Sequence, residues 1–118
     1  MAPRRVKMRH IMHLDKSPFE RIKNGKKKIE GRLNDKKRQK IKMGDEIIFI
    51  LRGTNEKLKV KVINLKKYKN FGEMFDKTDI NLWATDINTN KKFAKSFSYY
   101  SDEEIKNLGT VAIYFKLL

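Results

Sequence analysis

Residues 24–33 read NGKKKIEGRL and place three lysines and one arginine around a single acid. On a β-strand, Lys28, Glu30 and Arg32 would project to the same side. An arginine next to a glutamate holds the carboxylate ionised and oriented. The planar guanidinium of Arg32 also fits a phosphate group or the edge of a base. Two interpretations remain open: a ligand-binding site, or an ordinary ion pair that contributes little if it is exposed.

Lys27 would fall on the opposite side of such a strand from Glu30. Both side chains can face one cleft only if Lys27 lies in the turn before regular pairing begins, or if a bulge re-aims it. Gly25 favours such a turn, because glycine adopts left-handed backbone conformations without a steric cost. Lys27 can therefore join Glu30 and Arg32 in one pocket only from a helix-to-strand corner.

The whole chain is strongly basic. It has 118 residues, a formal net charge of +15 and a pI of about 10.1. This excess favours a polyanion partner, of which nucleic acid is the commonest. The alternative is a solvated surface in a proteome rich in Lys, Asn and Ile. The candidate phosphate contacts are Lys23, Lys26, Lys27, Lys28, Arg32, Lys36, Lys37 and Arg38.

RNA, single-stranded or structured, fits these features better than duplex DNA. The sequence contains no helix with the basic, groove-facing pattern of duplex readers. Trp83, Tyr99 and Tyr100 could stack on bases, and packing in the hydrophobic core is the other interpretation of these three aromatic residues.

The composition excludes several other classes of site. Without cysteine, the chain has no disulfide, no catalytic thiolate and no cysteine zinc site. His10 and His13, the only histidines, project to opposite faces of a strand, so we expect His10 in the core, His13 exposed and no metal site. No glycine pattern resembles a phosphate loop, and we expect no cofactor. No apolar run approaches the ~18 residues of a membrane span. Because the N-terminus also lacks a secretory signal, we expect a soluble, cytoplasmic protein with no membrane partner.

Changes in the period of the apolar residues predict the order of the elements. Strand 47–51 should be buried on both faces and should pair with 57–65 as an antiparallel hairpin. The expected strands are 6–14, 28–33, 47–51, 57–65 and 110–118. The expected helices lie within 16–25, 71–75, 90–100 and 101–108, and residues 34–46 form a polar loop.

The ends of two helices are also predicted. The first helix should have Ser17 as its N-cap and Glu20 completing a capping box, and it should pack through Phe19 and Ile22. The last helix should be capped at Ser101. Together the elements predict an α+β protein, a small mixed β-barrel with short helices packed at its ends. We expect residues 1–5 to form a flexible basic N-terminus and residues 6–118 to form a single domain.

The segment GKKKIEGR resembles the GxKxxExR signature of the ASCH domain, a family of PUA-like β-barrels. The matching residues are Gly25, Lys27, Glu30 and Arg32. PFERIKNG before the signature, IKMGDEIIF after it and the closing YYSDEEIKNLGTVAIYFKLL follow the order of the family, so the resemblance covers nearly the whole chain. It implies a stand-alone PUA-like domain whose ligand cleft is formed by these four residues, and it implies binding of RNA or another nucleic acid. Because this cleft would include Lys27, we predict that Lys27 lies at the helix-to-strand corner and points into the same pocket as Glu30 and Arg32.

One small bacterial branch of the family is an amidohydrolase that acts on N4-acetylcytidine. Its lysine acts with a threonine and a further acid. Lys27 matches the lysine, whereas Glu30 stands in the place of the threonine. Glu73, Asp76 and Asp79 are the candidates for the further acid.

Three functions are therefore open. The first is an RNA-binding module in which Arg32 and Lys27 contact phosphate or a base edge, and Glu30 orients Arg32 or reads an exocyclic amine. The second is a hydrolase of a modified nucleoside with Lys27 and Glu30 as catalytic residues, Glu30 serving as general base on water. The third is a basic module that binds an acidic protein surface.

Overall fold

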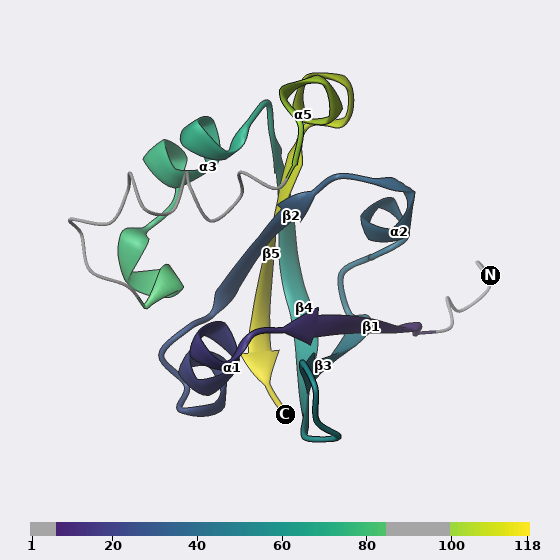
Figure 1. Ribbon diagram of the computed structural model, residues 1–118, viewed down its shortest axis with the longest axis vertical. Helices are drawn as coiled ribbons and strands as arrows, with labels where there is room; N and C mark the ends of the chain where they lie inside the picture. Colours follow the sequence, from purple (N-terminus) through teal and green to yellow (C-terminus); the bar gives the residue numbers. More distant parts are fainter. Residues whose placement is uncertain (1–6, 85–99) are drawn as a thin grey trace, which may run out of the picture.

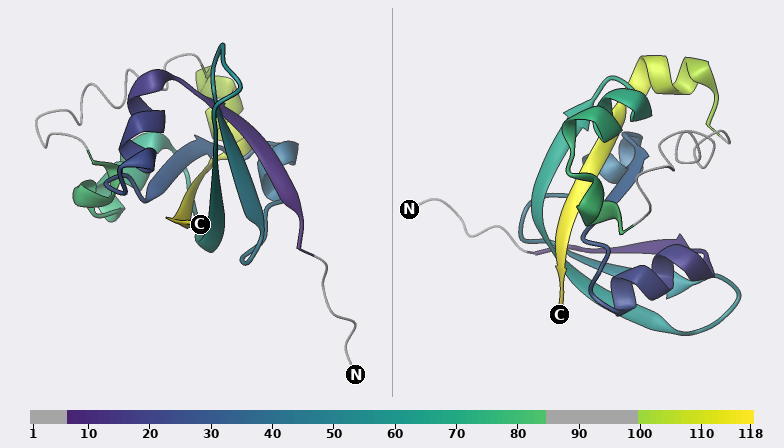
Figure 2. Two further views of the ribbon diagram at one scale, coloured as in Figure 1. Left: turned by 90° about the horizontal axis from the view of Figure 1, so that it is seen from below. Right: turned by 90° about the vertical axis from the view of Figure 1, so that its left-hand side faces the viewer.

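The computed structural model describes residues 7–84 and 100–118. Five strands form one curled sheet, a half-barrel with short helices packed around it (Figures 1 and 2). The predicted α+β class and barrel-like sheet are confirmed. The elements in chain order are β1 (Arg9–Leu14), α1 (Lys16–Lys23), β2 (Ile29–Leu33), α2 (Lys36–Gln39), β3 (Glu46–Leu51), β4 (Lys57–Tyr68), α3 (Phe71–Lys77), the 3₁₀ turn η1 (Ile80–Trp83), α5 (Asp102–Leu108) and β5 (Thr110–Leu117).

The sheet has the order β1-β3-β4-β5-β2. Strands β1 and β3 run parallel, and the other three neighbouring pairs are antiparallel. The predicted hairpin of β3 and β4 is present, with Ile47 opposite Val60. The C-terminal strand β5 lies between β4 and β2 and so supports the strand that carries Glu30 and Arg32. Strands β1 and β2 are the two edges of the half-barrel.

The inner face of the sheet holds the larger hydrophobic core. Phe49 of β3 and Phe115 of β5 meet there with 5.5 Å between their ring centroids. Helix α1 adds Phe19 and Ile22, which are fully buried, as their helical spacing predicted. Inward and outward residues alternate along β1, with His10 buried and its neighbours exposed, because successive side chains of a strand point to opposite faces.

A second core lies on the outer face, where α3 and η1 pack against β2 and β5. Trp83 and Met74 are fully buried in it. Gly31 of β2 permits their approach, because a Cβ at this position would lie 2.9 Å from both Met74 Sδ and Trp83 Cη2. Glycine therefore marks the point where a helical layer touches the strand backbone.

The start of α1 differs from the prediction. The helix has Asp15 in place of Ser17 as its N-cap, and it has no side-chain capping bond, so the proposed capping box with Glu20 is wrong. Asp15 Oδ1 instead accepts a hydrogen bond from Arg52 Nε at 2.9 Å. The first N–H groups of a helix have no intrahelical acceptor, so a proline, which lacks an N–H, fits at any position of the first turn. Pro18 therefore does not fix the residue at which the helix begins.

Two further segments differ from their predictions. Residues 34–46 contain the short helix α2, which begins after Asp35, whose Oδ1 accepts from Arg38 N at 3.0 Å. Strand β3 is buried on its inner face only. Ile48 and Ile50 on the other face are half-buried, because that face of the sheet stays partly open to solvent.

The last helix, α5, begins where the sequence predicted. Helix α5 has the predicted cap at Ser101, which forms a capping box with Glu104, and Gly109 follows its end. The amphipathic helix predicted for residues 90–100 lies outside the described residues, apart from Tyr100. Among the helices of the described part of the chain, none has the length and apolar character needed to cross a membrane.

Candidate functional site

The GxK segment forms the corner between α1 and β2. Gly25 has a φ of +80°, the left-handed conformation for which glycine is suited. The backbone N–H groups of Lys26 and Lys27 both donate to the carbonyl of Arg21, at 3.0 and 2.9 Å, and Lys28 N donates to Leu82 O at 2.8 Å. Hydrogen bonds to α1 and to η1 therefore hold the corner in place. Because it precedes regular pairing, the strand alternation that would have turned Lys27 away from Glu30 does not apply to it.

Glu30 lies at the centre of a group of buried charges. Its Oε1 is 3.8 Å from Lys27 Nζ and its Oε2 is 3.5 Å from Arg32 Nη2. Gly31 N donates to Oε1 at 3.1 Å. Lys27 and Glu30 are only 4% and 6% exposed, so this is not an ordinary surface ion pair.

Arg21 of α1 is a further member of the group, and the sequence did not identify it. Burial lowers the pKa of Arg21, and the nearby carboxylate of Glu30 acts in the opposite direction. The Nε of Arg21 is buried and has no hydrogen-bond partner among the described residues. No helix or strand period signals this proximity, because the turn at Gly25 brings α1 back toward β2.

Burial, two neighbouring cations and the carboxylate affect the protonation of Lys27. Burial lowers the pKa of Lys27; Glu30 opposes this shift, and the positive charges of Arg21 and Arg32 reinforce it. We refer to Arg21, Lys27, Glu30 and Arg32 as the Glu30 cluster. It contains three basic groups and one acid, and it therefore carries an excess of positive charge in a largely buried environment.

Arg32 also joins the two edges of the half-barrel. Its Nη2 donates to the carbonyl of His13 on β1 at 3.1 Å. Its side chain is 15% exposed, against 3% for the side chain of Lys27. Of these two basic groups, Arg32 is therefore the one that a ligand can reach more directly.

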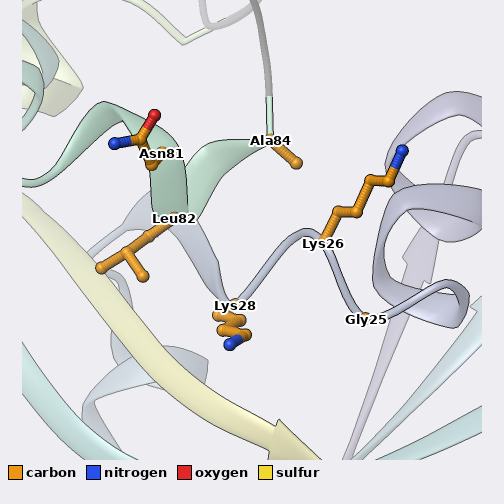
Figure 3. A pocket seen from close by; sticks show the side chains of 6 residues that line it. All are labelled: Gly25, Lys26, Lys28, Asn81, Leu82 and Ala84. Carbon is orange, nitrogen blue, oxygen red and sulfur yellow. The ribbon is translucent and has the colours of Figure 1, made fainter.

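A surface hollow of about 490 Å³ adjoins the corner (Figure 3). Lys26 and Lys28 are exposed and line it, while Lys27 between them is turned into the protein toward Glu30. Figure 3 shows the side chains of Lys26 and Lys28 leaving the backbone in different directions. The other lining residues are Gly25, Asn81, Leu82 and Ala84.

Of the three aromatic residues considered for base stacking, two pack against other side chains and one lies outside the described residues. Trp83 is fully buried, its ring lies 4.7 Å from Lys27 Nζ, and its Nε1 donates to Thr78 Oγ1 at 2.9 Å. Tyr100 is half-buried and stacks on Phe71 with 5.7 Å between ring centroids. Tyr99 lies outside the described residues. Trp83 therefore supports the ammonium of Lys27 from within the core.

The remaining predicted phosphate contacts are not members of the cluster. Lys23 is paired with Glu56 at 2.7 Å on the surface. Arg38 is paired with Asp35 at 3.2 Å, and its Nε is buried. Lys36 and Lys37 are exposed on α2.

The three acids considered as a further catalytic group have local structural contacts or lie on the surface. Glu73 Oε1 is 3.4 Å from Lys77 Nζ, and Asp79 Oδ1 accepts from Asn81 N at 3.0 Å. Asp76 is exposed on α3.

The two histidines lie as the strand period predicted. His10 is buried, and its Nε2 is 2.9 Å from Asp45 Oδ2. His13 is exposed. The described residues contain no group of three or more histidine or acidic side chains arranged to hold a metal ion.

Comparison with known proteins places this geometry in a family. The ASCH domain model matches residues 12–118. The chain is similar to the crystal structure of hypothetical protein PH0355, with 41% identity over 94% of this chain and all of that one, at a TM-score of 0.81. It is also similar to the solution NMR structure of protein PF0455 from Pyrococcus furiosus, with 34% identity over 94% of this chain and 98% of that one, at a TM-score of 0.72.

A more distant likeness shows the fold alone. The S128A mutant of ZmASCH from Zymomonas mobilis shares 12% identity over 93% of this chain and 68% of that one, at a TM-score of 0.51. A search of curated proteins found no match. The match over residues 12–118 includes the whole of the signature Gly25, Lys27, Glu30 and Arg32. The chain therefore belongs to the ASCH domain family.

Proposed function

We propose that this protein binds RNA, and that the Glu30 cluster holds a phosphate group of the strand. Membership of the ASCH family supports a general nucleic-acid-binding or RNA-related role. The observation that carries the finer proposal is the excess of basic groups over the single carboxylate of the cluster. A charge removed from water is costly unless it is paired. An anionic ligand would add to the compensation that Glu30 supplies.

Arg32 is the group that meets the ligand in this proposal. It is anchored by Glu30 and by the carbonyl of His13, so its guanidinium is held in a fixed orientation. A pre-oriented guanidinium loses little conformational entropy on binding a phosphate. Lys26 and Lys28, on the rim of the adjoining hollow, would contact neighbouring phosphates and would make the affinity depend on salt.

The experiment is a fluorescence-anisotropy titration with a labelled single-stranded RNA at two salt concentrations. Arg32→Gln should weaken binding by roughly 10- to 100-fold, which corresponds to the loss of a charge-assisted hydrogen bond. Arg9→Gln is the matched control, because Arg9 is also paired with an acid, Glu46, but is 64% exposed and lies at the other end of β1 from His13. Equal binding by both variants would contradict the proposal. If the native protein binds no RNA but captures an acidic protein, the basic interaction module is the correct function.

One observation favours a second candidate, hydrolysis of a modified nucleoside such as N4-acetylcytidine. Burial lowers the pKa of Lys27, and a neutral amine can act as a base or nucleophile. Glu30, with its carboxylate within 3.8 Å of the amine, would then be the general base on water. Lys27→Arg separates the two functions because it keeps a positive charge but has no accessible neutral form. Release of acetate by the native protein and its loss in Lys27→Arg, with RNA affinity unchanged, would establish the hydrolase.

A further inference from the structure

A second hollow lies between α2, the turn that follows it, and strands β4 and β5. Its volume is about 580 Å³. Three basic residues line it, Arg38, Lys42 and Lys67, and none of the residues that line it is acidic. Its apolar lining includes Leu65 and Val111. The combination of an apolar floor and basic groups suits a ligand with a flat apolar part and a negative charge.

The positive charge of this hollow is only partly compensated. Arg38 is paired with Asp35, but its Nε is buried without a hydrogen-bond partner among the described residues. In the part of the chain that the structure describes, no ion pair involves Lys42 or Lys67, and both are exposed. Two lysines are therefore available to an anion, next to a guanidinium that is already largely removed from water.

The hollow lies on the same face of the sheet as the Glu30 cluster. Val111 of β5 is directly opposite Arg32 on β2 and directly opposite Lys67 on β4. Residues that face each other across neighbouring strands project to the same side. Arg32 and Lys67 thus flank Val111, separated by two strand spacings of about 4.8 Å each. A ligand that reaches beyond Arg32 along this face meets the hollow next.

The turn beside the hollow also presents an unusual apolar side chain. Met43 lines the hollow and is 62% exposed, one of the large apolar residues that the fold leaves in solvent. A methionine is flexible and polarisable and packs well on flat aromatic surfaces. It could close over a base that rests on Leu65 and Val111, while the lysines hold the attached phosphate.

We propose that this hollow binds a nucleoside monophosphate unit, with the base between Met43 and Leu65 and the phosphate on Lys42, Lys67 and Arg38. The unit is either part of the RNA strand held at Arg32 or a free nucleotide. In the first case the inference rests on the proposed function, and the strand runs from the Glu30 cluster across Val111.

The test uses the full chain with Lys42→Gln and Lys67→Gln combined. The matched control is Lys57→Gln combined with Lys61→Gln, which removes the same charge from the opposite face of the sheet. Leu58 and Val60 between these lysines point inward, and the bulge between Val62 and Asn64 turns Lys67 to the other face. All four lysines lie at the surface or are half-buried, so we expect both variants to fold with native melting curves. Each protein is titrated with a labelled single-stranded RNA across a range of salt concentrations, and in a second arm with uridine 5′-monophosphate, uridine and inorganic phosphate by amide NMR.

If the strand supplies the ligand, the hollow variant loses about tenfold in RNA affinity and its log–log salt slope falls by roughly 0.7 per lost phosphate contact, whereas the control changes little. If the ligand is a free nucleotide, uridine 5′-monophosphate shifts the amides of Met43, Lys67 and Val111 in the native protein and not in the hollow variant, and uridine does not. Native RNA affinity in the hollow variant together with no response to the nucleotide overturns the inference. The proposed function still stands in that event if Arg32→Gln weakens RNA binding.

Discussion

Replacing Glu30 with glutamine tests whether the buried cations of the cluster depend on their carboxylate. The substitution keeps the size of the side chain and removes its charge. Glu30 is 6% exposed, and its two oxygens lie 3.8 and 3.5 Å from Lys27 Nζ and Arg32 Nη2. Removing one partner of a buried ion pair costs about 3–5 kcal/mol, because the remaining charge is left buried and uncompensated. Total stabilities are only about 5–15 kcal/mol, so the loss is a large part of the whole.

Urea denaturation followed by circular dichroism measures this loss as a lower midpoint at an unchanged m-value. The matched control is Glu56→Gln, whose pair with Lys23 has both side chains more than 40% exposed, and its midpoint should stay close to the native one. Combining Glu30→Gln with Lys27→Met should recover part of the loss, since one unpaired cation is then removed. Equal midpoints for the two single variants would refute the description of the cluster as buried and charge-coupled.

Two further predictions concern Lys27 and Gly31. Burial lowers the pKa of Lys27 in the folded protein below the ordinary 10.5 of the unfolded chain. In the pH range between the lowered folded-state pKa and the unfolded-state pKa, the unfolded chain binds more protons than the native protein. The unfolding free energy should therefore rise with pH across that range. Urea midpoints measured at a series of alkaline pH values should show this rise in the native protein and not in Lys27→Met; the same pH profile in both would argue against it. Gly31→Ala should cost about 1–3 kcal/mol by overpacking, because the new methyl group would meet Met74 and Trp83 at 2.9 Å. Thermal melting measures it, and an unchanged midpoint would show that this contact adjusts freely.

The parts of the fold that depend on local patterns could be predicted from the sequence. Strict alternation in 57–65 predicted the hairpin with 47–51, and the period of Phe71, Met74 and Phe75 predicted the buried face of α3. The cap at Ser101 was also predicted, since it depends only on the residues next to it. In each case the information lies within a few neighbouring residues.

The features that depend on distant segments could not be predicted in the same way. The pairing of β5 with β4 is a matter of tertiary packing, and so is the half-open face of β3, where Ile48 and Ile50 are only half-buried. Helix α2 consists of four residues, too few to show a period. It begins after Asp35, whose side chain caps it, and an aspartate fits the polar loop that was expected for residues 34–46 equally well.

The candidate site shows the same division. Glu30 and Arg32 were identified from their types and spacing, and Lys27 was added by the resemblance to the ASCH signature. The required position of Lys27 at the corner follows from strand geometry. Arg21 could not be identified, because its approach to Glu30 depends on the exact course of the turn at Gly25. The basic hollow beside α2 draws on residues 34–43, 64–67 and 111, and no single stretch of sequence reveals it.

The most direct measurement for the central claim is a crystal structure of the protein with a short single-stranded RNA. The excess positive charge of the Glu30 cluster predicts a phosphate oxygen within hydrogen-bond distance of the Arg32 guanidinium, with the Glu30 carboxylate still in contact with Arg32. An RNA bound only to lysines on the opposite face of β4, such as Lys57 and Lys61, with the cluster unchanged, would contradict it.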